Sequence, residues 1–126
     1  MGREKYLVDS NIIIKLATEN NLTDDSKSFL TAILNDSFNI SIITKIEVLS
    51  KDDSLIEFVK AANIFELDEA IVMHTIQLRR KYKIRLPDAI IAATSIVNKF
   101  ILITNNIKDF SNIKNLIVID PIDKVK

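Results

Sequence analysis

Short apolar runs alternate with longer amphipathic stretches along most of this chain. Five runs are rich in β-branched residues, and they lie at residues 6–8, 40–43, 64–67, 100–103 and 116–119. Their apolar positions are nearly continuous rather than alternating, which is typical of parallel strands that are covered on both faces. We therefore expect five strands in a mainly parallel sheet.

Six stretches between these runs carry apolar residues at helical spacing, at residues 11–17, 25–34, 44–50, 54–62, 68–82 and 87–97. Acids at 68–69 and cations at 79–81 suit the two ends of one helix, because each complements the helix dipole. Alternation of strands and helices predicts a three-layer α/β/α sandwich with a mainly parallel central sheet. The length of 126 residues predicts a single domain covering 1–126.

Composition narrows the chemistry. The chain has no cysteine, which excludes disulfide frameworks and cysteine-based zinc sites. His74 is the single histidine, which disfavours histidine-rich metal sites and a Ser–His–Asp triad. Gly2 is the only glycine, so neither a P-loop nor a dinucleotide fingerprint exists. Turns must then rely on Asn and Asp, and we expect them at residues 20–21, 35–36 and 105–106.

Charge and hydropathy set further bounds. The 17 Lys and Arg residues balance 17 Asp and Glu residues, which excludes a strongly basic nucleic-acid binder. A nucleic-acid enzyme with its own carboxylates stays possible. The longest uncharged apolar stretch, 89–97, is far shorter than the roughly 20 residues that cross a bilayer. The charged N-terminus, 1–8, is unlike a signal peptide, so we expect a cytoplasmic protein with no membrane association.

Four acids fall where strands end or where the following helices begin. Asp9 follows the first strand, Glu47 lies one helical turn after the second, Asp88 opens the helix at 87–97, and Asp109 follows the strand ending at Ile103. Because the carboxyl ends of parallel strands meet at one edge, these acids are expected to gather there. Two like charges about 4 Å apart repel by about 4 kcal/mol at an effective dielectric near 20, so such a cluster needs cations or shared protons. Oxygen-only ligands favour Mg²⁺ or Mn²⁺.

Each acid also has an ordinary structural interpretation. Asp9 could cap the first helix, and Asp88 could be a first-turn acid that the helix dipole favours. Glu47 could be an exposed helix residue, and Asp109 a turn or cap residue. Alanines at 89, 92 and 93 would let the helix at 87–97 lie close to the sheet and bring Asp88 near the strand ends. The shared edge favours the joint site over four separate explanations.

Four segments, in order along the chain, resemble motifs of one known protein family. The opening YLVDSNIII (6–14) resembles that family's LDTNIII, and IITKIEVL (42–49) resembles its ITEIELL. LPDAIIAAT (86–94) closely matches the family motif LPDAIIAAT, and LITNNIKDF (102–110) resembles the family motif LVTRNVKDF. The first motif alone is weakly specific, whereas the ordered set covers nearly the whole chain. By these motifs the chain resembles the PIN-domain ribonucleases of the VapC toxin type.

The resemblance implies a metal-dependent endoribonuclease that is the toxin of a type II toxin–antitoxin pair. It implies Mg²⁺ or Mn²⁺ as cofactor, an RNA substrate hydrolysed by metal-activated water, a cognate antitoxin and a homodimer. By carry-over, the catalytic and metal-binding acids would be Asp9, Glu47 and Asp88, with Asp109 as a further metal ligand. Supporting polar residues would be Ser10, Asn11, Thr104 and Asn106. Some members carry an acid where Asn106 stands, so the neutral amide of Asn106 would make the site less negative.

Alternatives remain at this point. The missing acid at Asn106 is also consistent with a catalytically weak PIN-like binding module that acts through RNA or antitoxin binding. A phospho-acceptor receiver domain is disfavoured, because its acidic pair and strand-end lysine are not evident. The basic run at 79–85 could contact RNA phosphates or an acidic antitoxin segment, but the usual cations of a helix C-terminus are the favoured explanation. The cations concerned are Arg79, Arg80, Lys83 and Arg85.

Overall fold

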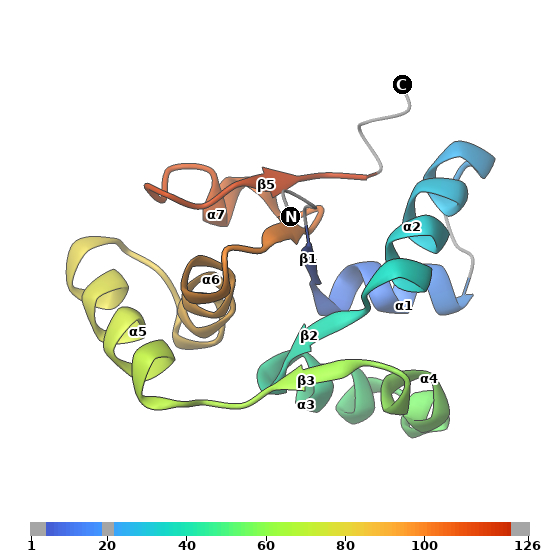
Figure 1. Ribbon diagram of the computed structural model, residues 1–126, viewed down its shortest axis with the longest axis horizontal. Coiled ribbons are helices and arrows are strands. Elements are labelled where there is room, and N and C mark those ends of the chain that lie inside the picture. The colour runs from blue at the N-terminus through green and yellow to red at the C-terminus, as the bar shows by residue number, and fades with distance from the viewer. Residues whose placement is uncertain (1–4, 19–21, 122–126) are drawn as a thin grey trace.

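A parallel five-stranded sheet forms the centre of the protein in a computed structural model that describes residues 5–18 and 22–121 (Figure 1). The strand order is β3-β2-β1-β4-β5, and every neighbouring pair is parallel. The strands are β1 (Tyr6–Val8), β2 (Asn39–Ser41), β3 (Asn63–Phe65), β4 (Ile101–Ile103) and β5 (Val118–Ile119). All strands therefore end at the same edge of the sheet, as the sequence predicts.

Helices connect the strands and cover both faces of the sheet. They are α1 (Ser10–Thr18), α2 (Asp24–Asp36), α3 (Ile42–Lys51), the 3₁₀ turn η1 (Asp53–Leu55), α4 (Ile56–Lys60), α5 (Glu69–Lys81), α6 (Leu86–Asn98) and α7 (Ile107–Phe110). Within the described ranges, no helix has the length and apolar character that crossing a membrane would require.

Two hydrophobic cores lie on opposite faces of the sheet, because neighbouring strand residues point to opposite sides. Leu7 and Leu102 pack against α5, α6 and the segment around α7, whereas Val8 and Ile103 pack against α1, α2, α3 and α4. Leu7, Leu102 and Ile103 are all fully buried. This double covering confirms the three-layer α/β/α sandwich.

Small side chains on α6 allow close packing, as expected. Ala89, Ala92 and Ala93 are completely buried in the core that α6 shares with α5 and the sheet. Pro87 sits in the first turn of α6, where its missing N–H costs no hydrogen bond. The start of α6, including Asp88, is therefore placed beside the ends of the strands.

Several predicted boundaries are wrong, and local hydrogen bonds explain two of them. The predicted strand at 40–43 ends at Ser41, whose Oγ accepts from the Ile43 N–H at 3.1 Å and caps α3. The predicted helix at 54–62 is divided into η1 and α4, since the Asp52 side chain accepts from the Ser54 N–H. The last strand covers only 118–119, and α7 was not predicted.

Turns form without glycine at two left-handed positions. Lys99 (φ 58°) ends α6, and its N–H reaches the carbonyls of Ile96 and Ser95. Asn115 (φ 71°) lies in the loop before β5. The turn predicted at 35–36 is wrong, because these residues still belong to α2. The turn at 105–106 is confirmed between β4 and α7, and the one predicted at 20–21 lies outside the described residues.

Candidate active site

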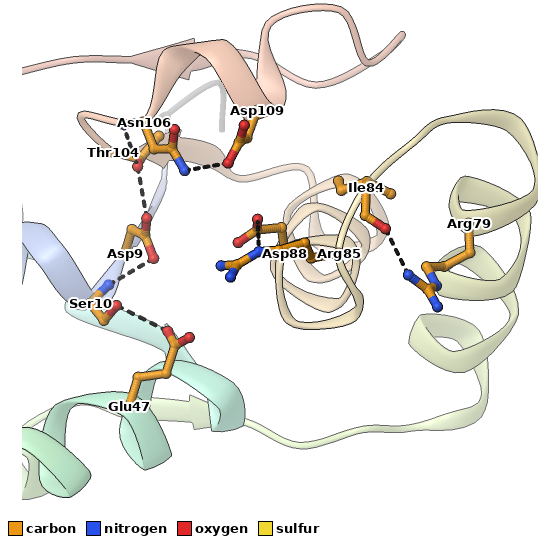
Figure 2. Close-up of polar contacts among 10 residues, drawn as sticks. All are labelled: Asp9, Ser10, Glu47, Arg79, Ile84, Arg85, Asp88, Thr104, Asn106 and Asp109. Carbon is orange, nitrogen blue, oxygen red and sulfur yellow. Dashed lines mark hydrogen bonds and ion pairs between the residues drawn. The ribbon is translucent and has the colours of Figure 1, made fainter.

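An open cavity of about 390 Å³ lies at the carboxyl edge of the sheet and brings three of the predicted acids together (Figure 2). Asp9 comes from the end of β1, Glu47 from α3 and Asp88 from the first turn of α6. Ser10, Asn11 and Asn106 also line this cavity. The parallel topology explains the gathering, since each acid follows a strand end or starts a helix at the same edge.

Asp9 is the most constrained of the three acids. It is buried, and its Oδ1 accepts from the Ser10 N–H at 2.8 Å while its Oδ2 accepts from Thr104 Oγ1 at 2.7 Å. The Thr104 hydroxyl oxygen itself accepts from the Asn106 N–H at 3.0 Å, which fixes its orientation. Burial raises the pKa of Asp9, although the bonds from Thr104 and Ser10 oppose this rise. One carboxylate oxygen of Asp9 therefore accepts a hydrogen bond from the start of α1, and the other accepts one from Thr104, which directly follows β4.

Glu47 faces the cavity from α3 and is half-buried. Its Oε1 accepts from Ser10 Oγ at 3.0 Å. Burial raises the pKa of Glu47, and the charges of Asp9 and Asp88 raise it further, whereas the Ser10 bond lowers it. The interpretation of Glu47 as a freely exposed helix residue is therefore wrong.

Asp88 shares the cavity with a cation. Its side chain is buried, and its Oδ2 lies 3.4 Å from Arg85 Nε, an ion pair in which the Arg85 side chain is 75% exposed. Burial raises the pKa of Asp88, and Arg85 opposes that rise. Ion pairs with an exposed partner stabilise proteins little. Arg85 is therefore held weakly and can exchange this contact for another anion.

Asp109 lies beside the three-acid group rather than within it. It is exposed on α7, and its Oδ2 accepts from Asn106 Nδ2 at 2.7 Å. It lines a smaller adjoining cavity of about 110 Å³ together with Asp88, Arg85 and Lys83. Asp109 contributes to the raised pKa of Asp88. The amide of Asn106 thus connects the two cavities.

The four cations predicted to contact RNA or an antitoxin lie in different places. Arg85 lines both cavities, and Lys83 lines the smaller one. Arg79 Nη1 donates to the Ile84 carbonyl at 2.8 Å, so it holds the connection between α5 and α6. Arg80 is exposed on α5 and lines neither cavity. His74 is likewise outside both, with Nδ1 3.2 Å from the Ala70 carbonyl one helical turn earlier.

Sequence reasoning missed the outer rim of the large cavity. Ile14, Ile46, Ser50 and Lys51 also line it, and Ile46 is 55% exposed. Helical spacing could have found Ser50 and Lys51, because residues three and four positions after Glu47 share its face of α3. The rim therefore combines apolar side chains with one lysine around an acidic floor.

Donor chemistry at this site fits a hard divalent cation. The carboxylates of Asp9, Glu47 and Asp88 offer only oxygen ligands, and burial raises the pKa of all three. Within the part of the chain that the structure describes, however, no three acid, histidine or cysteine side chains are gathered tightly enough to hold an ion as they stand. The hydrogen bonds from Ser10 and Thr104 and the Arg85 ion pair account for their separate orientations.

Thr104→Val should raise the pKa of Asp9 further. Valine keeps the shape of threonine but cannot donate to Asp9 Oδ2, and this bond is the strongest of the contacts that oppose the rise in the pKa of Asp9. Carboxyl carbon chemical shifts followed against pH would measure the change. Thr75→Val is the matched control, because Thr75 is also buried but donates to the Ile71 carbonyl on α5. An unchanged Asp9 titration in Thr104→Val would contradict the hydrogen-bond assignment.

A parallel α/β sandwich with a carboxylate group at its carboxyl edge defines the class of this protein. The chain belongs to the PIN domain family, which matches residues 6–116. This match confirms the resemblance carried by the four sequence motifs. None of the curated proteins compared with the chain matches it.

Solved structures, in contrast, include chains that are similar to this one. One similar chain is from a toxin–antitoxin complex of Klebsiella pneumoniae, at 31% identity and a TM-score of 0.74, covering 93% of this chain and 98% of that one. Another is from VapBC2 of Rickettsia felis bound to a promoter DNA fragment, at 24% identity and a TM-score of 0.74, covering 90% and 96%. DNA-bound VapBC of Salmonella typhimurium has 19% identity and a TM-score of 0.76, covering 94% and 99%. The last two likenesses concern the fold alone.

Proposed function

We propose that this protein is a metal-dependent endoribonuclease and the toxin of a type II toxin–antitoxin pair. The observation that carries the proposal is the convergence of Asp9, Glu47 and Asp88 on one open cavity. Membership of the PIN domain family supports nuclease chemistry, and the similarity to a chain of a Klebsiella pneumoniae toxin–antitoxin complex supports the toxin role. The proposal includes a cytoplasmic location and a single domain.

Asp9, Glu47 and Asp88 would hold the divalent ion, Mg²⁺ or Mn²⁺, with Asp109 at the edge of the same group. Such an ion supplies positive charge to a scissile phosphate and lowers the pKa of a bound water. Thr104 and Ser10 keep Asp9 in one orientation, so this carboxylate is the fixed point of the site. Asn11, which also lines the cavity, would be a supporting polar group.

The test is cleavage of a labelled RNA by purified protein. We expect cleavage with Mg²⁺ or Mn²⁺, its loss with EDTA, and its loss in Glu47→Gln. Glu57→Gln is the matched control, since Glu57 is an exposed glutamate that pairs with Lys60 on α4. Cleavage that survives EDTA, or equal activity of Glu47→Gln and the parent protein, would contradict the proposal.

The proposed partners are a cognate antitoxin and a second copy of this chain. An antitoxin segment could cover the large cavity, whose rim includes the exposed Ile46 beside the acids. Co-purification with the product of the neighbouring reading frame, followed by mass measurement of the complex, tests both partners. If the protein is monomeric and does not bind that product, the proposed toxin role is wrong. The nuclease role is then still tested by the RNA cleavage assay.

A second candidate function is a catalytically weak binding module that acts through RNA or antitoxin. Asn106 favours it, because an amide rather than a carboxylate lies beside Asp109 at the site. Calorimetry with Mn²⁺ discriminates between the two functions. No heat of binding at millimolar Mn²⁺ would favour the binding module, whereas saturable binding favours the enzyme.

Arg85→Gln should raise the affinity for Mn²⁺ and lower the affinity for RNA. Arg85 now pairs with Asp88 Oδ2, so removing it frees that oxygen and increases the negative charge of the site. The change in metal affinity should be about tenfold or less, because the lost ion pair has an exposed partner. Titration of Mn²⁺ by electron paramagnetic resonance measures it. Arg80→Gln is the control, and equal Mn²⁺ affinity in the two variants would contradict the prediction.

A further inference from the structure

A separate cavity, of about 380 Å³, lies at the end of α6 that is remote from Asp88. Since α6 has 13 residues, its two ends are about 20 Å apart at 1.5 Å per residue. This separate cavity is therefore at the amino edge of the parallel sheet, away from the acids. Its lining comes from the end of α6, the start of β4 and the loop before β5, with Ser95, Ile96, Lys99, Phe100, Asn115 and Ile117 among its residues.

Ser95 gives this cavity an unused hydrogen-bonding group. The side chain is fully buried, and its hydroxyl has no hydrogen-bond partner among the residues that the structure describes. Buried hydroxyl groups are nearly always paired, because an unpaired one loses its bonds to water without replacement. A polar group bound in the cavity would supply the missing partner.

The charge around this cavity favours an anion. An adjoining cavity of about 190 Å³ shares Ile96 and Asn115 with it and is lined by Lys81 and Lys114. Lys99 lines the cavity of about 380 Å³, and no Asp or Glu is among the described residues that line this cavity or the adjoining one. The C-termini of α5 and α6 contribute about half a negative charge each, so three ammonium groups leave a surplus of about +2.

Apolar surface and an amide complete the lining. Ile117 is 61% exposed, and Phe100 and Ile96 form the apolar side next to it. The Asn115 amide can donate and accept hydrogen bonds at the boundary between the two cavities. A fitting ligand has a flat apolar body, a hydrogen-bonding edge and an anionic group.

We propose that these two adjoining cavities, together called the groove, bind a nucleoside monophosphate unit, either as a free nucleotide or at the end of an RNA strand. The base would lie against Ile117 and Phe100, and the phosphate would lie toward the lysines at 99 and 114. Ser95 and Asn115 would hydrogen-bond to the polar groups of the nucleoside. The proposal does not depend on cleavage at the acidic site, because the groove and the acidic cavity lie at opposite ends of α6.

Isotope-labelled isoleucine methyl groups provide the test, because Ile117 and Ile96 report on this groove and Ile14 and Ile46 report on the acidic cavity. Uridine and adenosine monophosphates are added to the protein in EDTA. We expect saturable shifts of the Ile117 and Ile96 signals, with Ile14 and Ile46 unchanged. A short RNA with a terminal phosphate should shift the same signals if strand ends bind. If strand ends do not bind, only the free nucleotides should shift these signals.

Three outcomes would overturn the proposal. The first is no saturable shift at millimolar nucleotide, and the second is shifts confined to Ile14 and Ile46. The third is equal binding of inorganic phosphate and nucleotide, which would reduce the groove to a simple anion site. Uridine alone should bind more weakly than its monophosphate, and equal binding of these two would remove the lysines from the proposal.

Two variants separate binding from folding. Lys99→Asn keeps a residue that tolerates the left-handed conformation and should weaken nucleotide binding about tenfold, whereas Lys60→Asn on α4 should not. Ser95→Ala removes the unpaired hydroxyl, so it should melt no lower than the parent protein while binding nucleotide about three- to tenfold more weakly. A lower melting temperature with unchanged binding would assign Ser95 a structural role and contradict its place in the site.

Discussion

Replacing Asp9 by asparagine is expected to abolish RNA cleavage and, at the same time, to raise the melting temperature. Cleavage should fall by more than about 10²-fold, because even changes to groups that only orient metal ligands cost 10- to 100-fold. Stability should rise because Asp9 is a buried acid whose pKa burial raises, so its ionised form is unfavourable in the folded protein. Asparagine removes that charge and keeps an oxygen that can accept from Ser10 N–H or Thr104. RNA cleavage and thermal unfolding at pH 7.5 without metal measure the two effects.

Asp9→Ala separates the charge of this residue from its hydrogen bonds. It should lose activity equally, but it should melt lower than Asp9→Asn, because the Ser10 N–H and the Thr104 hydroxyl lose their acceptor. A buried polar group without its partner costs about 1–3 kcal/mol. A melting temperature of Asp9→Asn below that of the parent protein would contradict the assignment of Asp9 as a functional group that is held at a cost in stability.

The strand framework and the edge that carries the acids could be predicted from the sequence, because both follow from long-range burial. Near-continuous apolar runs such as Tyr6–Val8 and Ile101–Ile103 have few alternatives to a covered parallel strand. The alanine stripe of α6 likewise predicted the close packing that brings Asp88 to the strand ends. Parallel topology then places Asp9 and Glu47 at the same edge without any knowledge of side-chain contacts.

Boundaries were harder to predict because short-range hydrogen bonds compete with apolar pattern. Ile42 and Ile43 are β-branched and read as strand, yet the cap that Ser41 provides begins α3 at Ile42. The short helix α7 carries too few residues to show a helical period. The left-handed Lys99 has no sequence signal at all, since glycine or asparagine is the residue usually found there.

Details of the candidate site depended on side-chain contacts that the spacing of residues along the chain does not reveal. The bond from Thr104 to Asp9 joins residues 95 positions apart, and only the resemblance to a family had suggested that Thr104 supports the acids. The weak pairing of Arg85 with Asp88, and the position of Asp109 in a separate small cavity, depend on side-chain conformation. Spacing along the chain places residues at an edge, but it does not decide which of them touch.

Metal removal should make the stability of this protein fall as pH rises, and metal should reverse the fall. The pKa values of Asp9, Glu47 and Asp88 are all raised by burial, so the folded protein holds protons that the unfolded chain has already released. Their stabilising protonation is complete below the ordinary carboxyl range and is lost as pH rises through the raised values. We expect a lower melting temperature in EDTA at pH 7.5 than at pH 5.5.

Mn²⁺ should restore stability at pH 7.5, since a ligand that binds only the folded state stabilises it by about 2.7 kcal/mol at 100 times its dissociation constant. For a chain of this length that corresponds to about 10 °C in melting temperature. Asp52 does not disturb the comparison, because hydrogen bonds from Ser54 lower its pKa below 3.8, outside the range measured. Asp9→Asn is the internal control: its melting temperature should change less between the two pH values and respond less to Mn²⁺. If the parent protein without metal melted higher at pH 7.5 than at pH 5.5, with no response to Mn²⁺, the three acids could not be the metal-binding group that we propose.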